Sequence, residues 1–158
     1  MGLLRIQELG FFSRVSIAPG LMHNRRALEA WMRPCENLCF GCEECRKSLQ
    51  TLQFILSQEE TRVFLVFSDR DFAVGVIYFI GDSMHGGFFD GKILDKVPAF
   101  LEAMEIIKEQ YGRVTTAIPE GSPMLKFATR KLGFKETGDL GPVWDNGPEN
   151  LNVKMLEY

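Results

Sequence analysis

The sequence lacks the features that mark membrane, secreted and nucleic-acid-binding proteins. It has no apolar run of membrane-spanning length, and no N-terminal stretch that joins a basic start, an apolar middle and a small-residue cleavage site. Positive charge is not in excess either, since the formal net charge is -3 and the isoelectric point is about 5.5. We therefore expect a soluble, cytoplasmic protein with no membrane partner and no nucleic-acid partner.

Internal repeats, low-complexity tracts and flexible linkers are also missing. A chain of 158 residues has the size of one domain, and its 46% hydrophobic residues, 13 Phe among them, suffice for one core. We expect a single domain over residues 1–158, with a Cys-rich segment at 35–45 in an N-terminal helical region.

The clearest secondary-structure signal lies in the second half of the chain. Apolar residues recur on one face of a helix predicted at Pro98–Tyr111. A β-branched run, Arg113–Ile118, predicts a strand. A second helix is expected to open with Ser122 as its side-chain cap and to stop at Gly133. Helix N-termini favour anions, so this arrangement suits a phosphate-bearing ligand.

The rest of the chain also divides into strands and helices. In the first third of the chain, the pattern predicts short strands, or one interrupted strand, at Leu3–Ile6 and Ser13–Ala18, followed by a turn at Pro19-Gly20. A helix is predicted at Leu21–Met32, where Pro34 interrupts it, and a second helix then runs to about Leu56. Further strands are predicted at Thr61–Phe67, Phe72–Ile80, Met84–Phe89, Lys135–Trp144 and Leu151–Leu156. The first two of these read as an antiparallel hairpin.

The run from Ser122 to Gly138, Ser-Pro-Met-Leu-Lys-Phe-Ala-Thr-Arg-Lys-Leu-Gly-Phe-Lys-Glu-Thr-Gly, resembles the signature of the GNAT superfamily of N-acyltransferases. In that family an Asn or Ser caps a helix that ends in a Leu-Gly-Phe-type turn into a strand. The resemblance covers about Thr61 to Tyr158. It implies an α/β (α+β) fold: a mixed, mostly antiparallel sheet of six to seven strands with about four helices on both faces. It also implies acetyl-CoA as cofactor and a small-molecule or protein amine as acetyl acceptor.

The resemblance places the cofactor loop, (Arg/Gln)-x-x-Gly-x-(Gly/Ala), just before the Pro98 helix. The residues there are Lys92, Ile93, Leu94, Asp95, Lys96 and Val97. Their backbone N–H groups would hold the pyrophosphate, and Ser122 would lie near the pantetheine. The segment contains no glycine, whereas glycine lets N–H groups approach a pyrophosphate without interference from a Cβ atom.

Two residues are candidates for proton transfer. Thr129 stands where many family members have a Tyr that protonates the leaving thiolate, and a Thr hydroxyl is a much weaker acid than a phenol. His85, beside Gly86-Gly87, is a candidate to accept a proton from the amine, because its ordinary pKa lies near neutrality. A histidine at a strand edge is also commonly just exposed.

Two functions from different classes follow. The first is an N-acetyltransferase that uses acetyl-CoA. The second is a GNAT-like binding or assembly protein without catalysis, of the kind known among tailed bacteriophages, with a protein partner and a place in the virion. The glycine-free loop and Thr129 favour the second function.

All four cysteines lie close together in the sequence, at Cys35, Cys39, Cys42 and Cys45. Thiolates bind zinc or iron–sulfur clusters, and C-x2-C steps let neighbouring sulfurs converge on one centre. We therefore predict a zinc or [4Fe-4S] site with these four ligands, structural because four sulfurs leave no open position. The alternatives are reduced core cysteines, since the first three stand on one face of a helix, and disulfides.

Overall fold

A computed structural model describes residues 4–23, 35, 37–88, 93–142 and 152–158. Its centre is a seven-stranded sheet with the order β1-β2-β3-β4-β5-β7-β6. The strands are β1 (Arg5–Glu8), β2 (Thr61–Phe67), β3 (Ala73–Ile80), β4 (Ser83–Phe88), β5 (Thr115–Pro119), β6 (Lys135–Pro142) and β7 (Asn152–Glu157). Every neighbouring pair is antiparallel except β4 and β5, which are parallel.

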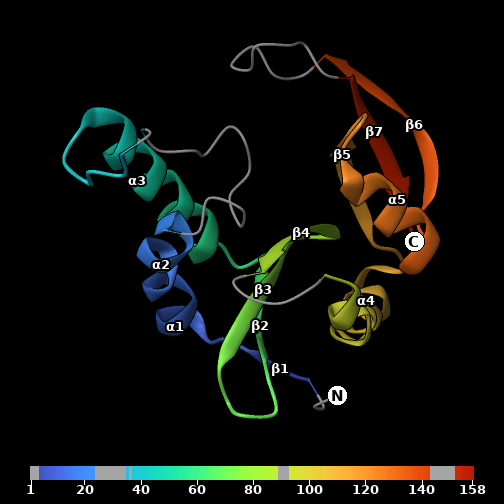
Figure 1. Cartoon of the computed structure of the whole chain (residues 1–158), viewed down its shortest axis with the longest axis horizontal. Coiled ribbons are helices and arrows are strands. Elements are labelled where there is room, and N and C mark those ends of the chain that lie inside the picture. The colour runs from blue at the N-terminus through green and yellow to red at the C-terminus, as the bar shows by residue number, and fades with distance from the viewer. Residues whose placement is uncertain (1–3, 24–34, 36, 89–92, 143–151) are drawn as a thin grey trace.

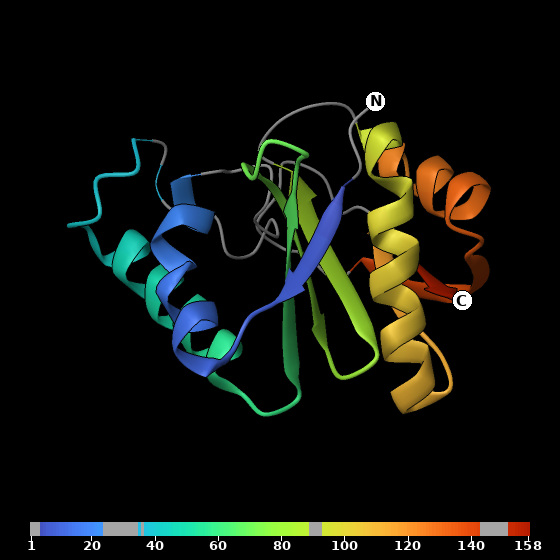
Figure 2. The same cartoon turned by 90° about the horizontal axis from the view of Figure 1, so that it is seen from below.

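Helices cover both faces of the sheet (Figure 2). The helices are α1 (Phe11–Ser16), α2 (Ala18–His23), α3 (Glu43–Ser57), the short 3-10 helix η2 (Ile93–Lys96), α4 (Val97–Tyr111) and α5 (Pro123–Lys131). α1, α2 and α3 lie on one side, and α4 lies on the other (Figure 2). The mixed, mostly antiparallel fold predicted from the sequence is thus confirmed. Within the described residues, no helix is both long and apolar enough to cross a lipid bilayer.

Each face of the sheet has its own apolar core. Under α4 and α5 the core joins Phe64, Ile77, Phe79, Phe100, Met104, Ile107, Phe127 and Leu132, among others. The second core, under α2 and α3, joins Leu21, Met22, Cys45, Leu52, Leu56, Val63, Val76 and Tyr78. Strands β2 and β3 supply residues to both cores, because alternate side chains of a strand point to opposite faces. This is why these strands are apolar throughout.

The predicted elements of the second half are close to those observed. α4 begins one residue before Pro98, and Gly112 follows it in the left-handed conformation, with φ +78°. Ser122 caps α5 by accepting a hydrogen bond from the backbone N–H of Met124. The strand predictions at Thr61–Phe67 and Phe72–Ile80 match β2 and β3, which pair as the expected antiparallel hairpin.

The N-terminal predictions need correction. Ser13–Ala18 is not a strand, since it contains the end of α1 and the start of α2. Tertiary contacts decide this: Arg14 donates from Nε to the carbonyl of Leu56 (2.6 Å) and from Nη2 to the carbonyl of Gln58 (3.1 Å), which ties α1 to the end of α3.

The turn predicted at Pro19-Gly20 is also wrong, since both residues lie in α2. Proline is tolerated in the first turn of a helix, where its missing N–H is not needed. The helix predicted at Leu21–Met32 is observed as far as His23, and the remainder lies outside the described residues.

The sheet divides between β4 and β5. Strands β2 and β3 pair from Thr61 to Phe67, and β3 and β4 pair from Gly75 to Ile80. In contrast, β4 and β5 share one pair, Ser83 with Thr115, and then diverge (Figure 1). Among the described residues the sheet is therefore a fork: β1 to β4 form one arm, and β5 to β7 form the other.

We expect Gly112→Ala to lower the free energy of unfolding by about 1–2 kcal/mol, because an L side chain is strained at positive φ. A Cβ there would meet no atom within 4 Å, so the loss reports backbone strain alone. Gly20→Ala in α2 is the matched control: its Cβ would also meet nothing, at an ordinary φ, and it should stabilise by about 0.4–1 kcal/mol. Denaturant unfolding measures both, and equal effects would contradict the assignment.

Candidate functional site

The base of the fork is held by hydrogen bonds between the two arms. The backbone N–H of Thr115 donates to the carbonyl of Asp82 (2.8 Å). The buried Thr116 hydroxyl donates to the carbonyl of Met84 (3.0 Å). Arg113 adds an ion pair to the carboxylate of Asp82 (2.7 Å). These contacts fix where the arms join, and therefore where they begin to separate.

The fork opens toward the carboxyl ends of β4 and β5. Because the two strands are parallel, both carboxyl ends lie at the same end of the sheet, and the chain continues from there to the N-termini of α4 and α5. In open α/β sheets, ligands bind at the carboxyl ends of parallel strands where the connections separate. By this topology, the chain leads from the open end of the fork to two helix N-termini, those of α4 and α5.

The fork is lined by backbone groups as well as side chains. The carbonyl of Met84 points toward β5, since it accepts from Thr116. Backbone groups two residues apart on a strand point toward the same edge, so the N–H and C=O of Gly86 face the fork too. By the same alternation, Ala117 faces it from β5, two residues after Thr115. Both edges therefore offer backbone donors and acceptors.

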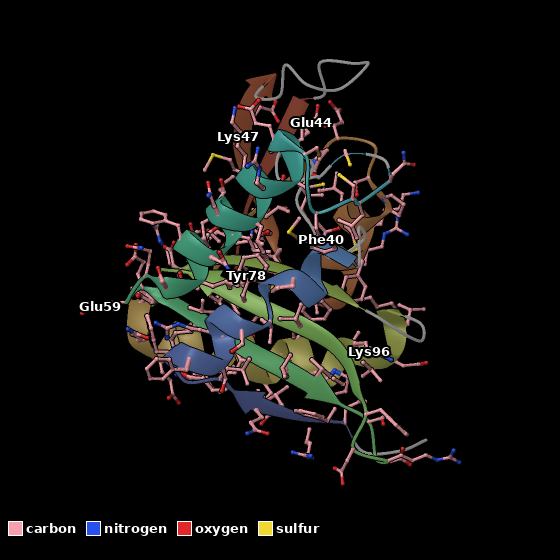
Figure 3. The ribbon with its side chains drawn as sticks, turned by 90° about the vertical axis from the view of Figure 1, so that its left-hand side faces the viewer. Phe40, Glu44, Lys47, Glu59, Tyr78 and Lys96 are labelled. Carbon is pink, nitrogen blue, oxygen red and sulfur yellow. The ribbon has the colours of Figure 1, made fainter. Side chains whose placement is uncertain are left out.

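The start of α4 combines a helix N-terminus with a buried cation. η2 runs directly into α4, and Lys96, its last residue, is the N-cap of α4. Lys96 is buried, with 6% of the residue exposed. Figure 3 labels it near the start of α4. Pro98 has no N–H, so the free donors of the first turn are fewer than in most helices. A positive side chain beside the positive end of a helix dipole is unfavourable unless an anion lies nearby.

The start of α5 offers less to an anion. Ser122 accepts from the N–H of Met124 with its hydroxyl (3.2 Å) and from the N–H of Leu125 with its carbonyl (3.0 Å). Pro123, which lies between Ser122 and Met124, has no N–H. The first-turn donors of α5 are thus used within the helix. Of the two helix N-termini considered from the sequence, α4 is the better anion site.

Thr129 lies in α5 with its hydroxyl turned back on its own helix. It donates to the carbonyl of Leu125 (2.9 Å), with the carbonyl of Lys126 at 3.4 Å. A threonine hydroxyl has one proton, and this proton is used in the helix. The geometry gives Thr129 no proton to donate elsewhere.

His85 lies on β4 on the opposite face from the neighbouring Met84, which packs under α4. Its ring stacks on Tyr78 of β3, with centroids 5.1 Å apart, and its Nε2 lies 3.2 Å from the hydroxyl of Ser83. Tyr78 belongs to the core under α2 and α3. His85 is therefore held in a fixed orientation, half-buried, next to Gly86 at the fork.

The four cysteines converge as the sequence predicted. Their four Sγ atoms all lie within 4.8 Å of one another. The Cys35 Sγ is 3.7 Å from the Cys39 Sγ and 3.3 Å from the Cys45 Sγ. All four are free thiols, so the disulfide alternative is not realised in this structure.

The single helical face proposed as an alternative for the cysteines is wrong. Cys35 and Cys39 precede α3, Cys42 is its N-cap, and only Cys45 lies inside it. The connecting backbone bends sharply, since Leu38 and Phe40 have φ of 47° and 57°. Left-handed conformations at non-glycine residues are not visible in a sequence pattern, and they bring together sulfurs that a helix would have spread along its length.

The crowded thiols differ in acidity. The pKa of Cys35 is lowered to about 6 by hydrogen bonds from the backbone of Cys39 and then from the thiol of Cys45. The backbone N–H of Cys45 lowers the pKa of Cys42, but the thiols of Cys39 and Cys45 raise it more, to about 12. The Cys35 thiol is therefore a stronger acid than the Cys42 thiol.

Sequence reasoning missed the residues that hold the base of the fork. Asp82 follows a turn glycine and Thr116 sits inside a β-branched run, so neither has a distinguishing local pattern. Tyr78, which orients His85, reads as one more apolar strand residue. Only the pairing of β4 with β5, which is distant in sequence, gives these residues their roles.

No protein-family model matches the sequence, and no curated protein matches it. Solved structures do match: a point variant of the spermidine N-acetyltransferase SpeG from Vibrio cholerae is 15% identical, with a TM-score of 0.66 over 98% of this chain and 92% of that chain. SpeG in complex with manganese ions is 14% identical (TM-score 0.65; 98% and 91%). The dodecameric form of that enzyme is 14% identical (TM-score 0.65; 98% and 92%). At this identity the likeness shows the fold.

We expect Thr116→Val to lower the free energy of unfolding by about 1–3 kcal/mol, because it removes a buried hydrogen bond across the base of the fork. Thr137→Val is the matched control, since the exposed Thr137 hydroxyl also donates to a carbonyl, that of Met155 (3.3 Å), and should change stability by less than about 0.5 kcal/mol. Denaturant unfolding compares the two. Similar values for both would show that the Thr116 bond does not hold the arms together.

Proposed function

We propose that this chain, whose fold is that of the GNAT N-acyltransferases, binds acetyl-CoA in the fork and transfers its acetyl group to an amine. The observation that carries the proposal is the single bridge between β4 and β5. A continuous sheet would leave no unpaired backbone at its centre. Among the described residues, β4 and β5 share no further pair, so their inner edges could pair with a ligand that carries amide groups of its own, as pantetheine does.

The cofactor would be held by backbone groups and by one cation. Gly86 and Ala117 would pair with the pantetheine amides from the two sides of the fork. Lys96 and the N–H group of Ala99 would lie toward the pyrophosphate, where an anion relieves the unfavourable pairing of the Lys96 charge with the helix dipole. The predicted loop, Lys92 to Val97, would then lie along the pyrophosphate, with Lys92 outside the described part of the chain.

Bound acetyl-CoA would supply an activated acyl group as a thioester. In the chain, the backbone N–H of Gly86 would donate to the thioester oxygen as that oxygen gains negative charge beside β4. His85 would accept the proton of the attacking amine, directly or through water, because it adjoins Gly86 and is fixed by Tyr78 and Ser83. Ser122 would lie beside the pantetheine at the start of α5. We assign the protonation of the leaving thiolate to water, since the Thr129 proton is used within α5.

The acceptor is an amine of a small molecule or of a protein. The structural neighbours are named as spermidine N-acetyltransferases, so a polyamine is a suitable first small-molecule acceptor to test. A peptide with a free N-terminus represents the protein class. Both amines need the same chemistry from the chain: loss of one proton as the nitrogen attacks the thioester.

We expect acetyl-CoA to raise the melting temperature of the purified chain, because a ligand that binds only the native state stabilises it by mass action. At 100 times the dissociation constant the stabilisation is about 2.7 kcal/mol. The 3′-phosphate of ADP, which lacks the pantetheine arm, tests the nucleotide end alone, and acetyl-pantetheine tests the fork alone. No shift with millimolar acetyl-CoA would end the proposal that the fork holds this cofactor.

His85→Gln should lower kcat/KM for acetyl transfer by roughly 100-fold or more near neutral pH, because it removes the general base and keeps a polar side chain of similar size. It should leave the acetyl-CoA thermal shift in place. Chromatographic detection of the acetylated amine measures the rate. His23→Gln, at the other histidine of the chain, is the control. An unchanged kcat/KM in His85→Gln would reject His85 as the base.

A second function has its own support. The donors at the start of α5 are used internally, Pro98 removes one at α4, and the predicted loop has no glycine. These features favour a GNAT-fold binding or assembly protein without acetyl transfer, with a protein partner, for example in a virion. A thermal shift without product, across both amine classes, would support this function over the enzyme.

A further inference from the structure

We propose that Cys35, Cys39, Cys42 and Cys45 together hold one zinc ion as a closed, tetrahedral tetrathiolate centre. The proposal concerns the N-terminal side of the molecule and is independent of acetyl transfer. It selects between the two kinds of centre that the cysteine spacing allows, one metal ion or an iron–sulfur cluster.

The distances between the sulfur atoms favour one ion. Four thiolates around zinc, each about 2.3 Å from the metal, have sulfur atoms about 3.8 Å apart. The observed separations of 3.3 Å and 3.7 Å, and the 4.8 Å limit for the whole set, are close to this value. An iron–sulfur cluster binds its thiolates through different iron atoms, which moves the sulfurs further from one another. The four sulfurs here are too close for that arrangement.

The backbone around the cysteines suits a negatively charged centre. The N–H of Cys42 points at the Cys39 sulfur (3.3 Å), and the N–H of Cys45 points at the Cys42 sulfur (3.4 Å). Cys42 is the N-cap of α3 and Cys45 lies in its first turn, so the sulfurs of both residues lie at the positive end of the helix dipole. Zinc with four thiolates carries a net charge of about -2, which both features stabilise.

The site is closed rather than catalytic. Cys45 is 1% exposed, and Cys35 and Cys42 pack against the core under α2 and α3. Leu38 and Phe40, the two residues with left-handed backbone, pack against the same core, and Phe40 lies on the α2 side of the sheet (Figure 3). Four protein sulfurs fill the coordination sphere of zinc and leave no position for a substrate. The ion would thus fasten residues 35–42 to α3 and to the core that contains Tyr78.

The test begins with the whole chain, purified without added metal under anaerobic, reducing conditions. Elemental analysis should find one zinc per chain. Removal of the metal with a strong chelator should lower the melting temperature, and added zinc should restore it. Replacement by cobalt should give the intense d–d bands of tetrahedral Co2+ together with thiolate charge-transfer absorption. A metal-free chain that is fully folded and insensitive to chelator would overturn the proposal. Iron with the visible absorption of a cluster would overturn it as well.

Substitutions at the exposed Cys39 separate metal binding from folding. Cys39→Ser should weaken zinc binding by more than the roughly 10–100-fold typical for loss of an outer-shell partner. Cys39→His should retain one zinc, because Cys3His sites are also tetrahedral and the position is exposed. Lys47→Gln is the control: it breaks the exposed Glu43–Lys47 ion pair on α3 (3.0 Å) and should leave zinc binding unchanged. Equal zinc affinity in Cys39→Ser and the unmodified chain would reject Cys39 as a ligand.

Discussion

The molecule depends on one constraint, the point at which β4 and β5 stop pairing. A single parallel bridge joins them, reinforced by the Thr116 hydroxyl on the carbonyl of Met84 and by Asp82. If the pairing extended further, the sheet would close and its centre would have no free backbone. If it were absent, the two arms would be joined only through the helices. In the part of the chain that the structure describes, separation after one pair gives both a continuous sheet and an internal edge.

Each face of the sheet is covered by its own apolar core, and the two cores contact different parts of the fork. The core under α4 and α5 crosses the fork, since it takes residues from β2 and β3 on one arm and from β5 and β7 on the other. It therefore holds the arms at a fixed separation. Among the described residues, the core under α2 and α3 joins these helices to the first arm and to the cysteine segment, and includes none from the second arm. A change in the cysteine centre would accordingly act on Tyr78 and His85 before it acted on the start of α4.

How much could be predicted from the sequence differs along the chain for physical reasons. α4 and α5 were predicted well because their signals are local: a periodic apolar face, a Ser cap and a glycine at the end. Ser13–Ala18 was misread because its helix is fixed by Arg14 bonds to the end of α3, far away in the sequence. The cysteines were predicted to converge, but their route depends on left-handed backbone at Leu38 and Phe40, which has no sequence signature. The base of the fork, at Asp82 and Thr116, depends on contacts between residues that are far apart in the sequence, so no local sequence pattern indicates it.

A forked sheet has four strand edges instead of two, and every free edge is a template on which another chain can add a strand. The outer edges are protected in different ways. β1 is short and carries Arg5, Gln7 and Glu8, while β6 is interrupted by irregularities near Gly138 and Gly141. The inner edges need another protection, and they have it because they face each other within one molecule. Within the described residues, this shape leaves the inner edges of β4 and β5 largely unpaired with each other and still limits the addition of a strand from a second chain.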